Sequence, residues 1–305
     1  MINYIIRRVL WAIPVLLIIS LVTFSLAHII PGGPFDREKP LPAEIIANLE
    51  AYYGLDDPLW KQYTDYLWNA LHGDFGPSYS SRSRTVNDIM GAHFPVSAQL
   101  GVLALFVAMV IGIPLGMIAS LRQNTFIDYF CMFFALLGVS VPSMTLGPLL
   151  VWVFALKLNI LPVARWGTWQ QAILPAFTLG IGSAAILARL TRASMLQVIR
   201  EDYIRTARAK GVSEKNVTVF HALKNALIPV VTIIGPLFAA LVTGSLIVEQ
   251  IFAIPGCGKY FITSITNRDY PVVLGIILLY ALLIIIANLL VDITYSWIDP
   301  RIRYS

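Results

Sequence analysis

Charged residues are scarce in this chain of 305 residues, of which 13% are charged and 57% are hydrophobic. Soluble globular domains carry about 25% charged residues. The mean hydropathy of +0.74 fits this shortage, so the composition predicts a protein embedded in lipid. The formal net charge is +5, but the basic residues flank apolar runs and form no separate basic domain. We therefore expect no nucleic-acid partner.

The residue types that build metal and catalytic sites are also few. The two cysteines, Cys131 and Cys257, lie too far apart for metal spacing, and the four histidines form no HExxH sequence. No G-x-S-x-G sequence marks a nucleophile. The stretch 256–259 lacks the first glycine and the final Ser or Thr of a phosphate-binding loop. We expect no metal site, no catalytic residue and no cofactor bound by this chain.

Long apolar runs are what the sequence does contain. Six of them are long enough to cross about 30 Å of hydrocarbon or close to it, and they cover 9–30, 98–121, 129–156, 171–188, 225–248 and 271–291. The first is too long for the apolar region of a signal peptide, about 7–15 residues, so we predict an uncleaved helix. By these boundaries no run contains an acid or a base, which argues against an ion-coupled carrier.

The positive charges predict the orientation of these runs. Thirteen Lys or Arg fall in the segments that would share one side of the membrane, whereas the short loops of the other side hold four. Positive charge in short flanking loops stays cytoplasmic. We predict an all-α membrane protein with six transmembrane helices and both termini in the cytoplasm. No internal repeat is apparent, which argues against an inverted-repeat carrier.

A large extracytoplasmic loop is predicted after the first helix. Residues 31–96 contain nine acids and five bases, and many aromatic residues. We predict a short helix over 43–53, and an amphipathic helix that starts at Asp57–Pro58 and stops before Gly73. The chain then divides into an N-terminal helix (1–30), this loop (31–96) and a five-helix core (97–305) with a cytoplasmic loop at about 192–224.

Prolines within two apolar runs indicate a candidate translocation path. A proline frees backbone carbonyls, which neighbouring hydroxyls or water must satisfy. An ordinary kinked helix is the alternative interpretation. The candidates are Ser140, Pro142, Ser143, Thr145, Pro236 and Thr243.

The cytoplasmic loop is the most basic part of the chain. Between Arg189 and Lys224 it holds eight Lys or Arg and three acids. Residues 203–210 are good helix formers, and no helix breaker occurs before Gly211. Ala207 and Gly211 are four residues apart, so we predict that they share a helix face that a partner can approach closely. The alternative is an ordinary solvated basic loop.

This loop resembles the cytoplasmic EAA loop of ABC-importer membrane subunits, whose consensus is EAA-x3-G-x9-I-x-L-P. Ala207, Gly211 and Leu223 match this consensus, whereas Arg205, Thr206, His221 and Lys224 replace its Glu, its first Ala, its Ile and its Pro. The sequences RTARAKG and HALKNALIP are typical of the peptide/nickel branch. The resemblance implies a short coupling helix that docks on an ATPase subunit. The residues implied are Arg205, Thr206, Ala207, Arg208, Lys210 and Gly211.

The resemblance to the oligopeptide permease, B-type subunits above all, extends over the whole chain. It is carried by IPGGPF (30–35), GDFGPSY (73–79), FPVS (94–97), NRDYP (267–271) and IDPRIRY (298–304). It implies the type I importer permease fold in a bacterial inner membrane. It also implies a second homologous permease subunit, two cytoplasmic ATPases that carry ATP and Mg²⁺, and an extracytoplasmic peptide-binding protein.

These observations lead to one functional hypothesis and several alternatives. We expect the transmembrane subunit of an ATP-driven oligopeptide importer, which forms half of a heterodimeric pathway and hydrolyses nothing itself. Related permeases handle dipeptides, nickel or oligosaccharides, so these substrates are alternatives. An ATP-independent carrier or channel, or a membrane-embedded enzyme, would belong to a different class.

Overall fold

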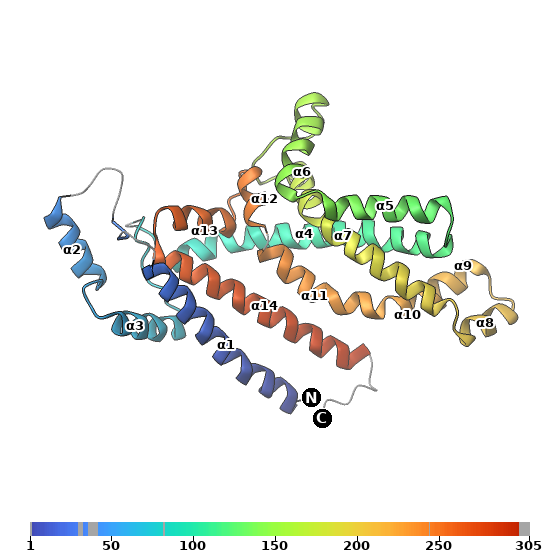
Figure 1. The fold of residues 1–305 in the computed structure, drawn as a ribbon, viewed down its shortest axis with the longest axis horizontal. Helices are drawn as coiled ribbons and strands as arrows, with labels where there is room; N and C mark the ends of the chain where they lie inside the picture. Colours follow the sequence, from blue (N-terminus) through green and yellow to red (C-terminus); the bar gives the residue numbers. More distant parts are fainter. Residues whose placement is uncertain (1, 30–32, 36–41, 82, 244, 299–305) are drawn as a thin grey trace. The chain divides into compact units, whose positions relative to one another are not determined.

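The computed structural model describes residues 2–29, 33–35, 42–81, 83–243 and 245–298, and these are helical with no strand (Figure 1). The sequences IPGGPF and IDPRIRY lie largely outside these ranges. The helices, η denoting a π-helix, are α1 (Ile2–Ile29), α2 (Ala43–Tyr53), α3 (Leu59–Leu71), α4 (Val86–Leu121), α5 (Phe126–Ser140), α6 (Ser143–Leu150), η1 (Val151–Lys157), α7 (Trp169–Val198), α8 (Asp202–Ala209), α9 (Glu214–Asn216), η2 (Val217–Leu223), α10 (Lys224–Ala226), α11 (Ile228–Thr243), α12 (Leu246–Ile251), α13 (Cys257–Thr266) and α14 (Tyr270–Ile298).

Five spans of the described chain are long and apolar enough to cross a membrane, and a bent pair makes a sixth if it counts as one. The prediction of one helix over 129–156 is wrong, because α5 and the helix after it meet at an angle of 104°. The break lies at Val141–Pro142, where Val141 is extended and Pro142 caps α6. A proline disfavours helical backbone at the residue before it and removes a backbone donor, so α5 ends there.

The chain forms two compact units, Met1–Val96 with Pro255–Ile285, and Ser97–Ile254 with Ile286–Ser305. In the first unit the predicted helix over 43–53 is confirmed as α2. The amphipathic helix is confirmed as α3, although Pro58 and not Asp57 is its cap residue. Gly73 follows the helix with φ +79°, a left-handed conformation that glycine adopts at little cost. The Tyr63 hydroxyl lies 2.9 Å from that of Ser20 and joins α3 to α1.

Asp269 holds two distant segments of the first unit together. Its buried carboxylate accepts hydrogen bonds from the Ser78 hydroxyl at 2.5 Å and from the backbone N–H groups of Tyr79 and Ser80 at 3.0 and 3.1 Å. The GDFGPSY and NRDYP sequences are therefore neighbours. Three donors satisfy one buried charge, which would otherwise be costly to remove from water.

The second unit is built around α7, with α5 and α11 packed along it (Figure 1). Glycines permit the close contacts. A Cβ atom on Gly180 would lie 2.4 Å from the Ala104 carbonyl oxygen, and one on Gly116 would lie 2.3 Å from that of Ala188. Helices in lipid associate through such small residues.

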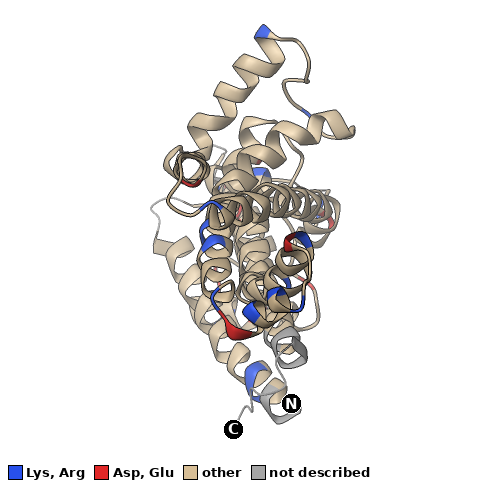
Figure 2. Ribbon diagram, turned by 90° about the vertical axis from the view of Figure 1, so that its right-hand side faces the viewer, with Lys and Arg blue, Asp and Glu red and all other residues tan. Residues whose placement is uncertain are grey.

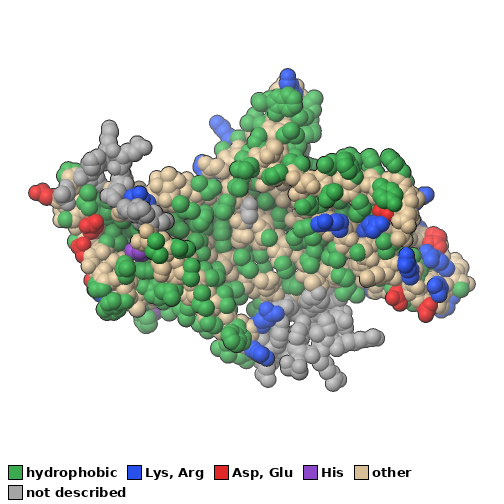
Figure 3. Space-filling model, in the orientation of Figure 1, with side chains coloured by type: hydrophobic (Ala, Val, Ile, Leu, Met, Phe, Trp, Pro, Cys, Tyr) green, Lys and Arg blue, Asp and Glu red, His purple; other side chains and the backbone are tan. Residues whose placement is uncertain are grey.

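Charge and apolar surface separate within the second unit. Large apolar side chains are exposed along α5, namely Phe126, Phe130, Phe133 and Phe134, as expected of a surface that faces lipid tails. Figure 3 shows Lys and Arg side chains, with some Asp and Glu, gathered at the end that Figure 1 labels α8 and α9, and Figure 2 views the ribbon from this end with the charged positions coloured. This separation places the basic helix α8 outside the apolar layer.

Candidate coupling surface and translocation path

Helix α8 has complementary charges at its ends. Asp202 lies in its first turn and Arg208 in its last, so each side chain faces the favourable end of the helix dipole. The Arg208 guanidinium pairs with Glu214 at 2.8 Å, and Arg205 lies 3.5 Å from Asp202. Gly211 adopts φ +77° just beyond the helix. These exposed pairs orient the side chains and contribute little stability.

The inner face of α8 is part of the core of the second unit. Ile204 is fully buried and Ala207 is 8% exposed, and both belong to an apolar cluster with Met195 of α7, Val217 and Ala222. The Asn225 side-chain amide also donates to the Tyr203 hydroxyl at 2.7 Å. The short helix is therefore attached to α7 and to the segment that leads into α11.

The prediction that Ala207 and Gly211 share one open helix face is wrong. Helix α8 ends at Ala209, and Ala207 points into the cluster. Gly211 lies in a left-handed turn, where a Cβ atom added to it would have no heavy atom within 4 Å. The remaining predicted coupling residues, Arg205, Thr206, Arg208, Lys210 and Gly211, are all exposed. The structure thus brings five of the six predicted residues to the surface.

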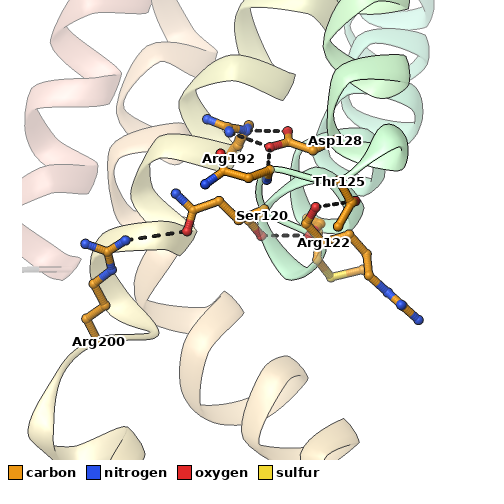
Figure 4. A network of polar contacts seen from close by, with 9 residues as sticks. Ser120, Arg122, Thr125, Asp128, Arg192 and Arg200 are labelled. Carbon is orange, nitrogen blue, oxygen red and sulfur yellow. Dashed lines mark hydrogen bonds and ion pairs between the residues drawn. The ribbon is translucent and has the colours of Figure 1, made fainter.

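An ion pair fixes the C-terminal part of α7, and the sequence did not predict it. Arg192 donates through Nε and Nη2 to the two carboxylate oxygens of Asp128, both at 2.6 Å (Figure 4). The Asp128 side chain is 2% exposed, and the backbone N–H of Asn124 also donates to it. Two parallel bonds of this kind are stronger and more directional than a single one. The α4–α5 loop is thereby joined to the helix that supports α8.

Helix α5 and its neighbours place the predicted path residues at the bend. Ser140 ends α5 and donates to the Leu136 carbonyl at 2.9 Å, while Pro142, Ser143 and Thr145 begin α6. Next to the bend a cavity of about 490 Å³ is lined by apolar residues such as Val141, Leu146 and Phe177. None of the four predicted residues lines it.

The other two path candidates lie on α11. Pro236 is exposed, and the Thr243 hydroxyl donates to the Ala239 carbonyl at 2.9 Å, within its own helix. The hydroxyls of Ser140 and Thr243 thus each satisfy a carbonyl one turn earlier, as is usual for hydroxyls in apolar helices.

Two acidic residues just outside the predicted apolar runs lie inside the helices of the structure. Glu249 lies within the candidate span Ile228–Ile251, is 0% exposed, and lies 2.6 Å from both the Ser97 and Ser245 hydroxyls. Asp128 lies buried in the first turn of α5. The helices extend past the boundaries drawn from hydropathy. The buried carboxylates of Glu249 and Asp128 are tolerated there because each has hydrogen-bond partners within the protein.

The fold and the site define a class, a multi-pass α-helical transport component with an exposed basic helix beside its apolar layer. The family model described as "Binding-protein-dependent transport system inner membrane component" matches residues 112–304. Its N-terminal companion, described as "Binding-prot-dependent transport system membrane comp, N-term", matches residues 1–101. The chain belongs to this family, and it is a multi-pass protein of the bacterial inner membrane.

Characterised relatives agree over the full length. The chain is 48% identical to the dipeptide transport system permease protein DppB of Bacillus subtilis, covering 99% of this chain and 98% of the relative. It is 46% identical to the oligopeptide transport system permease protein OppB of Salmonella typhimurium, covering all of both chains. Identity to the glutathione transport system permease protein GsiC of Escherichia coli is 43%, again over all of both chains.

Solved structures support the fold alone. The inward-facing MetNI methionine ABC transporter matches with a TM-score of 0.55 at 18% identity, covering 69% of this chain and 96% of that chain. An amino acid ABC transporter matches with a TM-score of 0.51 at 16% identity, covering 70% of this chain and 94% of that chain. The helical core thus has the fold of an ABC-importer permease.

Proposed function

We propose that this chain is one of two membrane subunits of an ATP-driven importer of peptides. The observation that carries the proposal is helix α8, whose inner residues Ile204 and Ala207 are buried while Arg205, Thr206 and Arg208 face outward. A short helix held in the core on one side presents a rigid, basic surface on the other. Such a surface suits a partner that must transmit motion to the membrane helices.

The relatives support peptides as the substrate class. The named substrates of the three relatives above are a dipeptide, an oligopeptide and glutathione, which all contain peptide bonds. Identities of 48% and 46% to the dipeptide and oligopeptide proteins differ too little to choose a peptide length. Oligopeptides are our first choice and dipeptides the alternative.

The partners follow from the proposed transport cycle. The complex contains a second, homologous permease subunit, two cytoplasmic ATPases that bind ATP and Mg²⁺, and an extracytoplasmic peptide-binding protein. This chain binds no nucleotide and contributes α8 and the turn at Gly211 as its docking surface. Both termini lie in the cytoplasm and residues 31–96 on the outer side, as the charge distribution predicts. Ser140, Pro142, Ser143, Thr145, Pro236 and Thr243 remain the candidates for the path.

A Gly211→Leu substitution in the reconstituted complex tests the docking surface. Gly211 has φ +77° and open space around it, so a large side chain disturbs the docking turn and should leave the fold intact. We expect the variant to reach the membrane in normal amounts. Peptide uptake should fall at least about ten-fold, which corresponds to about 1.4 kcal/mol of coupling, while basal ATP hydrolysis continues. Uptake and ATPase rates in proteoliposomes measure this.

Gly73→Leu provides the matched control. Gly73 has nearly the same backbone conformation, φ +79°, and equally open surroundings, but it lies in the first unit. The Gly73→Leu variant therefore introduces the same local strain at a position that contacts no ATPase. Wild-type uptake by the Gly211 variant, or an equal loss in both variants, would refute the docking assignment. Uptake by this chain alone without ATP would refute the importer itself.

A further inference from the structure

The first unit contains a cavity that the transport function has not explained. Its volume is about 330 Å³, near the lower limit of small-ligand sites and suited to a single amino-acid side chain. Segments from across the unit meet there: the end of α1, the α2–α3 turn, α3, the GDFGPSY sequence and the start of α14. The residues that decide its chemistry are His28, Asp65, Tyr66, Asp74, Tyr79 and Tyr270.

Aromatic rings form much of the cavity wall, and Asp269 holds one part of that wall in place. The backbone N–H of Tyr79 donates to Asp269, which orders the chain at that ring. The Tyr79 ring lies 4.7 Å from that of Tyr53 and 6.4 Å from that of Tyr270, centroid to centroid. Packed rings of this kind present their negative faces to a bound cation.

The charged residues of the cavity are acidic. Asp57, Asp65 and Asp74 line it, and among the described residues no Lys or Arg does. Lys61 pairs with Asp57 at 2.8 Å, and the Gly76 N–H donates to Asp74 at 2.9 Å. Asp65 makes no hydrogen bond to a described residue. The cavity therefore carries net negative charge.

One polar atom in the wall lacks a partner. The Tyr66 hydroxyl is buried and forms no hydrogen bond among the described residues, and burial raises the pKa of Tyr66, so the group stays protonated. An unsatisfied buried hydroxyl is energetically costly. A ligand that donates a hydrogen bond to its oxygen would remove this cost.

The arrangement fits an organic cation better than a metal ion. No group of three or more His, Cys, Asp or Glu in the described part of the chain is placed to hold a metal ion. The negative charge is instead spread along an aromatic wall, which matches an ammonium or guanidinium group with an apolar stem. The size of the cavity limits the occupant to about one residue.

We propose that this cavity binds one ammonium or guanidinium group of a peptide, from a Lys or Arg side chain or from the amino terminus. The assignment of the ligand to a peptide rests on the proposed function, whereas the preference for a cation rests on the cavity alone. The cavity would hold a peptide at the first unit before or during its passage to the path.

Ligand-detected NMR on the intact complex in lipid nanodiscs, without ATP and without the external binding protein, tests the proposal. The probes are Nα-acetyl-lysine methylamide, its neutral counterpart Nα-acetyl-norleucine methylamide, and alanyl-alanine amide, whose cation is the amino terminus. We expect the lysine probe to bind and the norleucine probe not to bind. Binding of the alanyl probe would show that an amino terminus also occupies the cavity, which the proposal includes.

Two variants locate the binding. Asp65→Asn should weaken binding of the lysine probe about five-fold, the effect of one charge at about 4 Å in a watery site, and Tyr66→Phe should weaken it by a similar factor. Asp56→Asn is the matched control, because Asp56 is exposed and does not line the cavity.

Several results would overturn the proposal. These are equal binding of the lysine and norleucine probes, equal effects of the Asp65 and Asp56 variants, or no binding of any cationic probe. Because uptake plays no part in this measurement, such a failure leaves the importer function standing. Conversely, cation binding by a complex that imports no peptide would refute the function and keep the site.

Discussion

At the scale of residues, the Asp128–Arg192 pair is the contact with the greatest consequence. The Asp128 side chain is 2% exposed and that of Arg192 27%, so solvent screens the pair far less than the exposed pairs on α8. Both carboxylate oxygens are engaged by the guanidinium (Figure 4). Removing one partner leaves the other group buried without the charge that compensates it, which is energetically costly.

We expect Asp128→Asn to lower the free energy of unfolding by about 2–3 kcal/mol, measured by thermal unfolding in nanodiscs. Arg192→Lys should also lower the free energy of unfolding, by a smaller amount, because lysine cannot form the two parallel bonds. Arg200→Gln is the control, since among the described residues the Arg200 side chain makes only an exposed contact of 3.4 Å with Gln123. Losses of the same size in the Asp128 and Arg200 variants would contradict the anchoring role of the pair.

At the scale of elements, the contact between α4 and α7 depends on the absence of side chains. Cβ atoms on Gly112 and Gly116 would lie 2.4 and 2.3 Å from carbonyl oxygens of α7. Two helices can approach so closely only where both present small residues. The contact also lies beside the residues that attach α8, because Met117 packs on the same cluster as Ile204.

Gly116→Ala should therefore destabilise the protein by about 1–3 kcal/mol, the usual cost of overpacking. Gly91→Ala makes the same substitution in the same helix where nothing lies within 4 Å. That variant should be neutral or more stable by about 0.5–1 kcal/mol, because alanine favours helix over glycine. Thermal unfolding of both variants measures the difference, and equal stabilities would show that α4 and α7 are not in close contact there.

At the scale of the whole molecule, the topology depends on the bent pair α5 and α6. If the pair crosses the membrane as one span, the described chain has six spans, and the loop after Lys157 lies opposite the loop between α4 and α5. If the pair turns back, the count is five. The charge distribution favours the six-span arrangement, so we expect the bend to occur within a crossing.

Cysteine labelling in whole cells distinguishes the two arrangements. With a membrane-impermeant maleimide, Lys157→Cys should react in intact cells, whereas Gln123→Cys, in the loop before α5, should react only after permeabilisation. Both positions are exposed, and the native Cys131 and Cys257 are buried, so background labelling should be low. The same accessibility at both positions would show that α5 and α6 form a re-entrant segment.

Local features of the structure were largely predictable. Helix α2 has the predicted bounds, and α3 ends where Gly73 allows a left-handed turn. Each depends on residues within a few positions of one another. The inward position of Ala207 was not predictable, because it depends on where α8 stops and on which face meets Met195.

The sequence alone determined the immersion in lipid, the helical class and the family, because hydropathy and short motifs are local properties of the chain. Only the tertiary structure decided the 104° bend and the Asp128–Arg192 pair. It also decided the hydrogen bond between Ser78 and Asp269, two residues that are 191 positions apart in the sequence. Contacts across such separations depend on how helices pack, and burial decides which charges persist. For the same reason the aromatic, acidic cavity became visible only when its separate segments were brought together.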